Sequence, residues 1–253
     1  TMFLEQLGCG WYGPDELWQV VPEYPTLAVG VLEIDHEPAF RARFTQVYAQ
    51  YPEVGSRWYL GGDKTSTGHG IQALIPVDEH LESHPEWFAL VDGKRDPLSH
   101  YGWQYDYSNR ELAQAVAEKV VAELDAQPLL TNYSIAANDG FEDGWCQCED
   151  CAALGNPTDQ ILTFANRVAE IVAEKHPDKT VSILSYHNSF FPPEKVKALS
   201  NVEVMFCREA SMTTPLDLNQ AVLGKNEWTH NTYTQSWLGN FQEYMQNASL
   251  KHV

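Results

Sequence analysis

The sequence predicts an α/β fold, and within that class a (β/α)8 TIM-like barrel. Segments typical of strands alternate with segments typical of helices, a pattern that indicates a mostly parallel sheet. The strand segments that begin at residues 129, 180 and 202 are nearly continuous apolar runs, as in sheets covered on both faces. No G-x-G-x-x-G follows the first strand segment, which counts against a Rossmann fold. About six or seven strand segments are present instead of eight, so we expect a barrel that is incomplete at its C-terminus or has a last strand beyond residue 253.

The N-terminal part of the chain is predicted to form a lead-in to this barrel. Residues 1–25 are expected to be a lead-in helix or the tail of an upstream domain, and residues 26–253 the barrel itself. The first expected elements are strands at 26–34 and 57–60, a glycine-rich loop at 61–70, a short helix at 77–84 and a hairpin that turns at Asp92-Gly93.

The remaining elements have clearer signals. Ser108 or Asn109 can cap a helix whose apolar side chains repeat at 112, 116, 120 and 124, and Thr158 or Asp159 can cap a second helix that Pro177 ends. Strands are expected at 129–137, 180–186, 202–207 and 228–234, with helices at 193–199 and 241–250.

Composition and charge exclude several classes of partner. The chain has 16 Lys and Arg against 35 Asp and Glu, a formal net charge of -19, and this field repels the phosphates of nucleic acids. No run of 18 apolar residues predicts a membrane span, and the opening residues lack the pattern of a signal peptide.

Three common catalytic motifs are missing from the sequence: G-x-S-x-G, the P-loop and H-E-x-x-H. Serine hydrolases, ATP enzymes and zincins therefore lose support as function classes.

Polar side chains follow the predicted strands at the end where a barrel has its active site. They are rich in carboxylates, amides, Tyr, His and Trp, a lining that suits a neutral polyol such as a sugar. The candidate substrate-binding residues are His69, Tyr107, Tyr186, His187 and Arg208. Two of them have a structural alternative: His69 as a surface histidine, and Arg208 as the ion-pair partner of Asp139 or a neighbouring carboxylate.

Asp139 is the candidate catalytic acid. It follows an apolar strand, and cleavage of a glycosidic bond needs a carboxylic acid that protonates the leaving oxygen. The alternative is a plain Asn-Asp-Gly turn, in which Asp139 only caps the loop that follows.

Four segments in order resemble one protein family. They are FLEQLGCGWYGPDELWQVVP, HPEWFALVDGKR, NDG followed by CQCEDC, and SYHNSFFPP. Together they are similar to the bacterial domain of unknown function 4838, found in glycoside hydrolase family 163, from about residue 3 to about residue 209. The resemblance implies a barrel glycosidase, an endo-β-N-acetylglucosaminidase that acts on complex N-glycans, in the periplasm or outside the cell. It also implies that the opening segment closes a small upstream domain. The resemblance itself weakens after Glu209.

An N-acetylglucosaminidase of this kind can use the acetamide of its own substrate as the second catalytic group. Asp139 would then be the acid, while Asn138 or Tyr186 orients the acetamide. Two other hypotheses compete for the function. One is a catalytically impaired barrel that binds carbohydrate, and the other is a metal-dependent hydrolase that uses His69, His187 and His230 with Asp139.

Three of the five cysteines have the spacing C-x-C-x-x-C, at Cys146, Cys148 and Cys151. This spacing suits a structural zinc ion, which needs a fourth ligand. Cys207 is the expected fourth ligand, with His187 as the second candidate. The alternative to a metal site is three reduced thiols packed as small apolar groups. No cofactor is expected for the catalytic step itself.

Overall fold

Two long helices packed on a parallel sheet form the core of this computed structural model, which describes residues 2–40, 42–43, 54–66, 68–99, 102–140 and 144–207. The chain divides into two units, Thr1–Lys64 and Thr65–Val253. The expected strand at 228–234, the expected helix at 241–250, and also Arg208 and His230, lie outside the described residues. None of the described helices is both long enough and apolar enough to cross a membrane.

The first unit contains short elements. They are α1 (Met2–Gln6), β1 (Gly10–Trp11), η1 (Glu16–Trp18), β2 (Gln19–Val20), β3 (Ala42–Arg43), α3 (Val54–Arg57) and β4 (Gly61–Gly62). Strands β1 and β2 pair antiparallel, as do β3 and β4. The indole of Trp58 donates to the carbonyl of Trp11 at 2.9 Å, which ties α3's end to the first hairpin.

The strand predicted at 26–34 is wrong, because residues 21–40 form neither helix nor strand. Val31 is fully exposed, and Leu27 and Val29 are also exposed. High β propensity gives a strand only where another strand pairs with it, and no described strand pairs with these residues. The expected strand at 57–60 is also absent, because α3 ends at Arg57 and residues 58–60 form a turn before β4.

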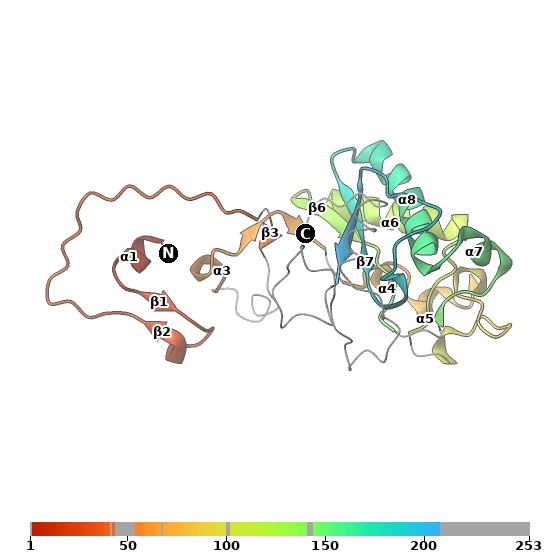
Figure 1. Ribbon diagram of the computed structural model, residues 1–253, viewed down its shortest axis with the longest axis horizontal. Coiled ribbons are helices and arrows are strands. Elements are labelled where there is room, and N and C mark those ends of the chain that lie inside the picture. The colour runs from red at the N-terminus through yellow and green to blue at the C-terminus, as the bar shows by residue number, and fades with distance from the viewer. Residues whose placement is uncertain are drawn as a thin grey trace. The chain divides into compact units, whose positions relative to one another are not determined.

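The second unit carries the main sheet and its helices (Figure 1). Strand β5 (Lys64–Thr65) spans the division between the units. The elements that follow it are α4 (Ile71–Leu74), α5 (Val77–His80), η2 (Pro85–Trp87), η3 (Pro97–Ser99), α6 (Arg110–Ala126), β6 (Leu130–Ser134), α7 (Glu149–Leu154), α8 (Pro157–Lys175), β7 (Thr180–Ser185), η5 (His187–Ser189) and β8 (Val202–Phe206). The sheet order is β5-β6-β7-β8, and β6, β7 and β8 run parallel. The α/β class is therefore confirmed, but four strands do not close a barrel within the described residues, and the TIM-like barrel stays a prediction.

Helices α6 and α8 cover one face of this sheet with apolar side chains. The four residues that predicted α6 (Leu112, Val116, Val120 and Leu124) are at most 1% exposed, and Asn109 caps the helix by accepting a hydrogen bond from the Leu112 N–H at 2.9 Å. From the sheet, Val181, Ile183, Val202 and Val204 pack into the same core. The opposite side is more polar than expected, because Ser182 Oγ donates to Asn132 Oδ1 at 2.8 Å.

Helix α8 begins two or three residues earlier than the predicted caps. Asn156 is the N-cap, and Asp159 completes a capping box by accepting from the Asn156 N–H at 3.2 Å. The short helix predicted at 193–199 is wrong. Residues 193–199 form no helix, and the N–H groups of Glu194, Lys195 and Val196 converge instead on Asp159 Oδ1, at 3.0, 2.7 and 3.2 Å.

Candidate functional site

The parallel strands β6 and β7 end at the same edge of the sheet, and a pocket lies there. Its lining includes Asn138, which follows β6, and Tyr186 and His187, which follow β7. His69 reaches the pocket from the loop after β5. Four residues predicted from the sequence therefore lie in one pocket at the edge where open parallel sheets bind their ligands.

A close backbone contact fixes the turn after β6. A Cβ on Gly140 would lie 1.9 Å from the Cα of Gly102, and a Cβ on Gly144 would lie 2.2 Å from the Gly102 carbonyl oxygen. The two chain segments can approach this closely only because both positions are glycine. The Asn-Asp-Gly sequence therefore reflects tight backbone packing as well as a turn.

Asn138 is held rigidly below the pocket surface. Its amide Nδ2 donates to the Trp103 carbonyl at 3.0 Å, its backbone N–H donates to Gln104 Oε1 at 3.1 Å, and its carbonyl accepts from Gln104 Nε2 at 2.9 Å. The side chain is 7% exposed, and its Oδ1 accepts no hydrogen bond from the described residues. A buried carbonyl oxygen without a donor is costly in a folded protein and points to a ligand as its partner.

Asp139 lies beside the pocket rather than in its lining. Its side chain is 60% exposed, and its Oδ1 lies 3.8 Å from His69 Nε2, while His69 Nδ1 contacts the Ala137 carbonyl at 2.5 Å. This second contact orients the imidazole ring toward Asp139. The His69 ring also lies 5.9 Å from that of Tyr186, so an acid, an imidazole and a phenol stand together at the strand ends.

His187 has an unusual backbone conformation in this pocket. Its φ is 45°, in the left-handed region that few residues other than glycine adopt. Its ring packs edge-on against that of Tyr186, with the centroids 3.9 Å apart. Backbone strain of this kind clusters at ligand sites, where the surrounding structure holds it in place.

Tyr107 lies beneath the pocket and not in it, in contrast to its predicted contact with substrate. It is fully buried, and its hydroxyl donates to Gln104 Oε1 at 2.8 Å. The sequence missed Gln104 and Trp145, which do line the pocket. Neither follows a predicted strand, so the rule that selected strand ends could not find them.

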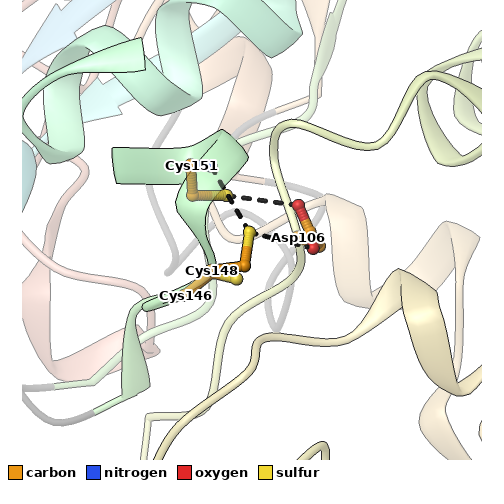
Figure 2. Close-up of side chains that lie close together, drawn as sticks. All are labelled: Asp106, Cys146, Cys148 and Cys151. Carbon is orange, nitrogen blue, oxygen red and sulfur yellow. Dashed lines mark hydrogen bonds between the residues drawn. The ribbon is translucent and has the colours of Figure 1, made fainter. Parts of the chain in front are cut away.

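The second group of functional side chains is the cysteine cluster (Figure 2). Ligand atoms of Asp106, Cys146, Cys148 and Cys151 all lie within 4.8 Å of one another, so these four residues could hold a metal ion. Cys148 and Cys151 donate to the two carboxylate oxygens of Asp106, at 3.5 and 3.2 Å. All but Cys148 are buried.

Cys207, the expected fourth ligand, is not part of this cluster. It follows β8, where its thiol donates to the Met205 carbonyl at 3.9 Å. The fourth residue of the cluster is Asp106, which lies in the turn before α6. No spacing pattern connects Asp106 to the motif, because it is 40 residues from the nearest of the three cysteines.

Burial and hydrogen bonds, both within the cluster and from its neighbours, shift the pKa values of its groups. The hydrogen bond from Cys151 lowers the pKa of the Cys146 thiol, and the same contact raises the pKa of the Cys151 thiol. Burial raises the pKa of Asp106, but hydrogen bonds from Ser108, Cys151 and Arg95 outweigh it and leave that pKa below its ordinary value.

Comparison with known families gives one match. A family model described as "Domain of unknown function (DUF4838)" matches residues 11–247. No curated protein and no solved structure matches the chain.

Proposed function

The chain belongs to the family of the domain of unknown function DUF4838, and on this premise we propose that it is a glycoside hydrolase acting on glycans that contain N-acetylglucosamine. The proposed activity is that of an endo-β-N-acetylglucosaminidase. Its substrate is an oligosaccharide or glycan, bound in the pocket at the ends of β6 and β7.

The observation that carries this proposal is the unpartnered Oδ1 of Asn138. It is a fixed acceptor next to Asp139, and the N–H of an acetamide group is a donor of matching chemistry. The amide orientation is set by the Nδ2 contact with Trp103, so the acceptor atom faces away from that bond.

The remaining lining suits a sugar. Trp145 and Tyr186 offer aromatic rings and His187 an imidazole, while Asn188 and Ser189 add hydrogen-bonding groups. Binding sites of this type combine apolar and aromatic walls with a few placed polar groups.

In the proposed reaction Asp139 protonates the leaving glycosidic oxygen. No carboxylate is among the described lining residues, so a second acid of the kind that ordinary glycosidases use is not present there. Substrate-assisted glycosidases replace that group with the acetamide of the substrate, and Asn138 would orient this acetamide. The zinc ion that we propose for the cysteine cluster is structural and takes no part in bond cleavage.

A carbohydrate-binding barrel without activity is the second candidate. It is favoured by the exposure of the Asp139 side chain and by the lack of a lining carboxylate in the described part of the pocket.

A panel of N-glycans tests both candidates. We expect the protein to bind glycans that contain N-acetylglucosamine, measured by calorimetry, and to release shortened products, measured by mass spectrometry. The matched controls are glycans of the same size that lack acetamide groups, which we expect neither to bind nor to react. Binding without release would favour the second candidate, and neither binding nor release would refute both.

A further inference from the structure

The cysteine cluster has the composition of a metal centre with one oxygen ligand. We propose that Asp106, Cys146, Cys148 and Cys151 bind one zinc ion, and that this ion fixes the wall of the pocket that contains Trp145 and Gln104. Zinc accepts thiolate and carboxylate ligands and prefers four of them in a tetrahedron at structural sites.

Backbone groups already prepare two of the sulfurs for this role. The N–H of Leu90 donates to Cys146 Sγ at 3.3 Å, and the N–H of Cys151 donates to Cys148 Sγ at 3.3 Å. Hydrogen bonds to sulfur favour the thiolate, which is the form that binds metal. Thiols packed only as small apolar groups would not need these donors.

The carboxylate of Asp106 is oriented by groups that do not belong to the cluster. Arg95 Nη1 donates to its Oδ2 at 3.0 Å, and the Ser108 N–H donates to its Oδ1 at 3.1 Å. Partners that orient a ligand from behind are a regular feature of metal sites. Arg95 also supplies a positive charge that offsets part of the excess negative charge of three thiolates and a carboxylate around Zn²⁺.

The dimensions require only a small contraction. Zinc–sulfur bonds of about 2.3 Å place tetrahedral ligand atoms about 3.8 Å apart. The four ligand atoms here lie within 4.8 Å of one another, so movements of about 1 Å or less would complete the site.

The metal centre and the pocket share two short chain segments. Trp145 precedes Cys146, and Gln104 lies two residues before Asp106, so one ion would hold both segments that form this wall. The Gln104 N–H donates to the Gly144 carbonyl at 3.1 Å, and the rings of Tyr107 and Trp145 lie 5.4 Å apart. Loss of the ion would release the loop that carries Trp145.

Metal content of the purified full chain tests the first part of the inference. We expect about one zinc per chain in protein prepared without chelator, and uptake of zinc by metal-free protein. Cys151→Ser should lose this zinc, whereas Cys207→Ser, the matched control, should keep it. Absence of zinc from the unmodified chain together with no uptake would overturn the site, as would equal loss in both variants.

Asp106 needs a separate comparison, because its removal also breaks the contacts with Arg95 and Ser108. Asp106→Cys should retain zinc and Asp106→Asn should bind it at least about tenfold more weakly, since only the first keeps an anionic ligand. Binding of cobalt(II) in place of zinc adds a spectroscopic signature of thiolate coordination. Unchanged zinc affinity in Asp106→Asn would remove Asp106 from the ligand set.

Tryptophan fluorescence tests the link to the pocket without any glycan. Removal of zinc should shift the emission of the unmodified chain to longer wavelength, and Trp145→Phe should lose most of this shift although seven other tryptophans remain. The same shift in both proteins would refute the link. The zinc site and its link to Trp145 do not depend on the proposed function. One consequence does rest on it: metal-free protein should bind glycan more weakly. Failure of glycan binding would therefore refute that consequence and leave the zinc and fluorescence results unaffected.

Discussion

At the scale of single residues, the site depends on a few polar side chains whose orientations are fixed by hydrogen bonds. The Asn138 side chain is held through its amide nitrogen while its oxygen has no donor among the described residues, and His69 is held by a carbonyl while it faces Asp139. Such a side chain is preorganised, because the protein has already ordered it before a ligand arrives.

Outside the site, His80 makes the stability of the second unit depend on pH. Burial, followed by the nearby Lys119, lowers the pKa of His80 from its ordinary value of 6.5. Above pH 6.5 the ring is neutral in both the folded and the unfolded chain. As the pH falls below 6.5, the unfolded chain binds the proton first, so stability is lost until the pH passes the lower folded pKa.

We therefore expect the urea midpoint of the protein to fall between pH 7.5 and pH 5.5, and His80→Gln to reduce that fall. His36→Gln, at an exposed position in the first unit, is the control and should leave the fall unchanged. An equal fall in the unmodified protein and in His80→Gln would contradict the assignment.

At the scale of elements, the start of α8 is joined to a loop by one carboxylate. Asp159 is fully buried, accepts from the Asn156 N–H in the capping box and accepts from three successive N–H groups of the loop at 194–196. This loop leads into β8, so the carboxylate links the helix to the sheet that positions Tyr186 and His187.

Asp159→Ala should lower the free energy of unfolding by about 3–5 kcal/mol, because four N–H groups lose their shared, fully buried acceptor. Chemical unfolding followed by circular dichroism measures this change. Asp178→Ala, an exposed aspartate after α8, is the control and should change stability by less than about 0.5 kcal/mol. A loss of similar size in both variants would contradict the role given to Asp159.

At the scale of the whole molecule, the periodic elements were predictable and the irregular ones were not. Strands β7 and β8 and helices α6 and α8 follow from apolar spacing and caps, with small errors at their ends. The strand at 26–34 failed because pairing decides whether a β-rich segment becomes a strand. The helix at 193–199 failed in a segment whose N–H groups at 194–196 donate to the side chain of Asp159, a contact that local sequence does not reveal.

The same distinction applies to the site. Asn138, Tyr186 and His187 could be found because they follow strands, and the three clustered cysteines because their spacing is local. Asp106, Gln104 and Trp145 could not be found, because only the folded chain brings residues 102–108 and 144–151 together.

The role of Asp139 is the central claim, and hydrolysis of a complex N-glycan by matched variants tests it most directly. We expect Asp139→Asn to cleave at least about 100-fold more slowly than the unmodified chain while binding the glycan with similar affinity, because a general acid acts only in the transition state. Asp150→Asn, at an exposed carboxylate in α7, should cleave at the unmodified rate. Full hydrolysis by Asp139→Asn, measured by mass spectrometry of the released products, would contradict the assignment.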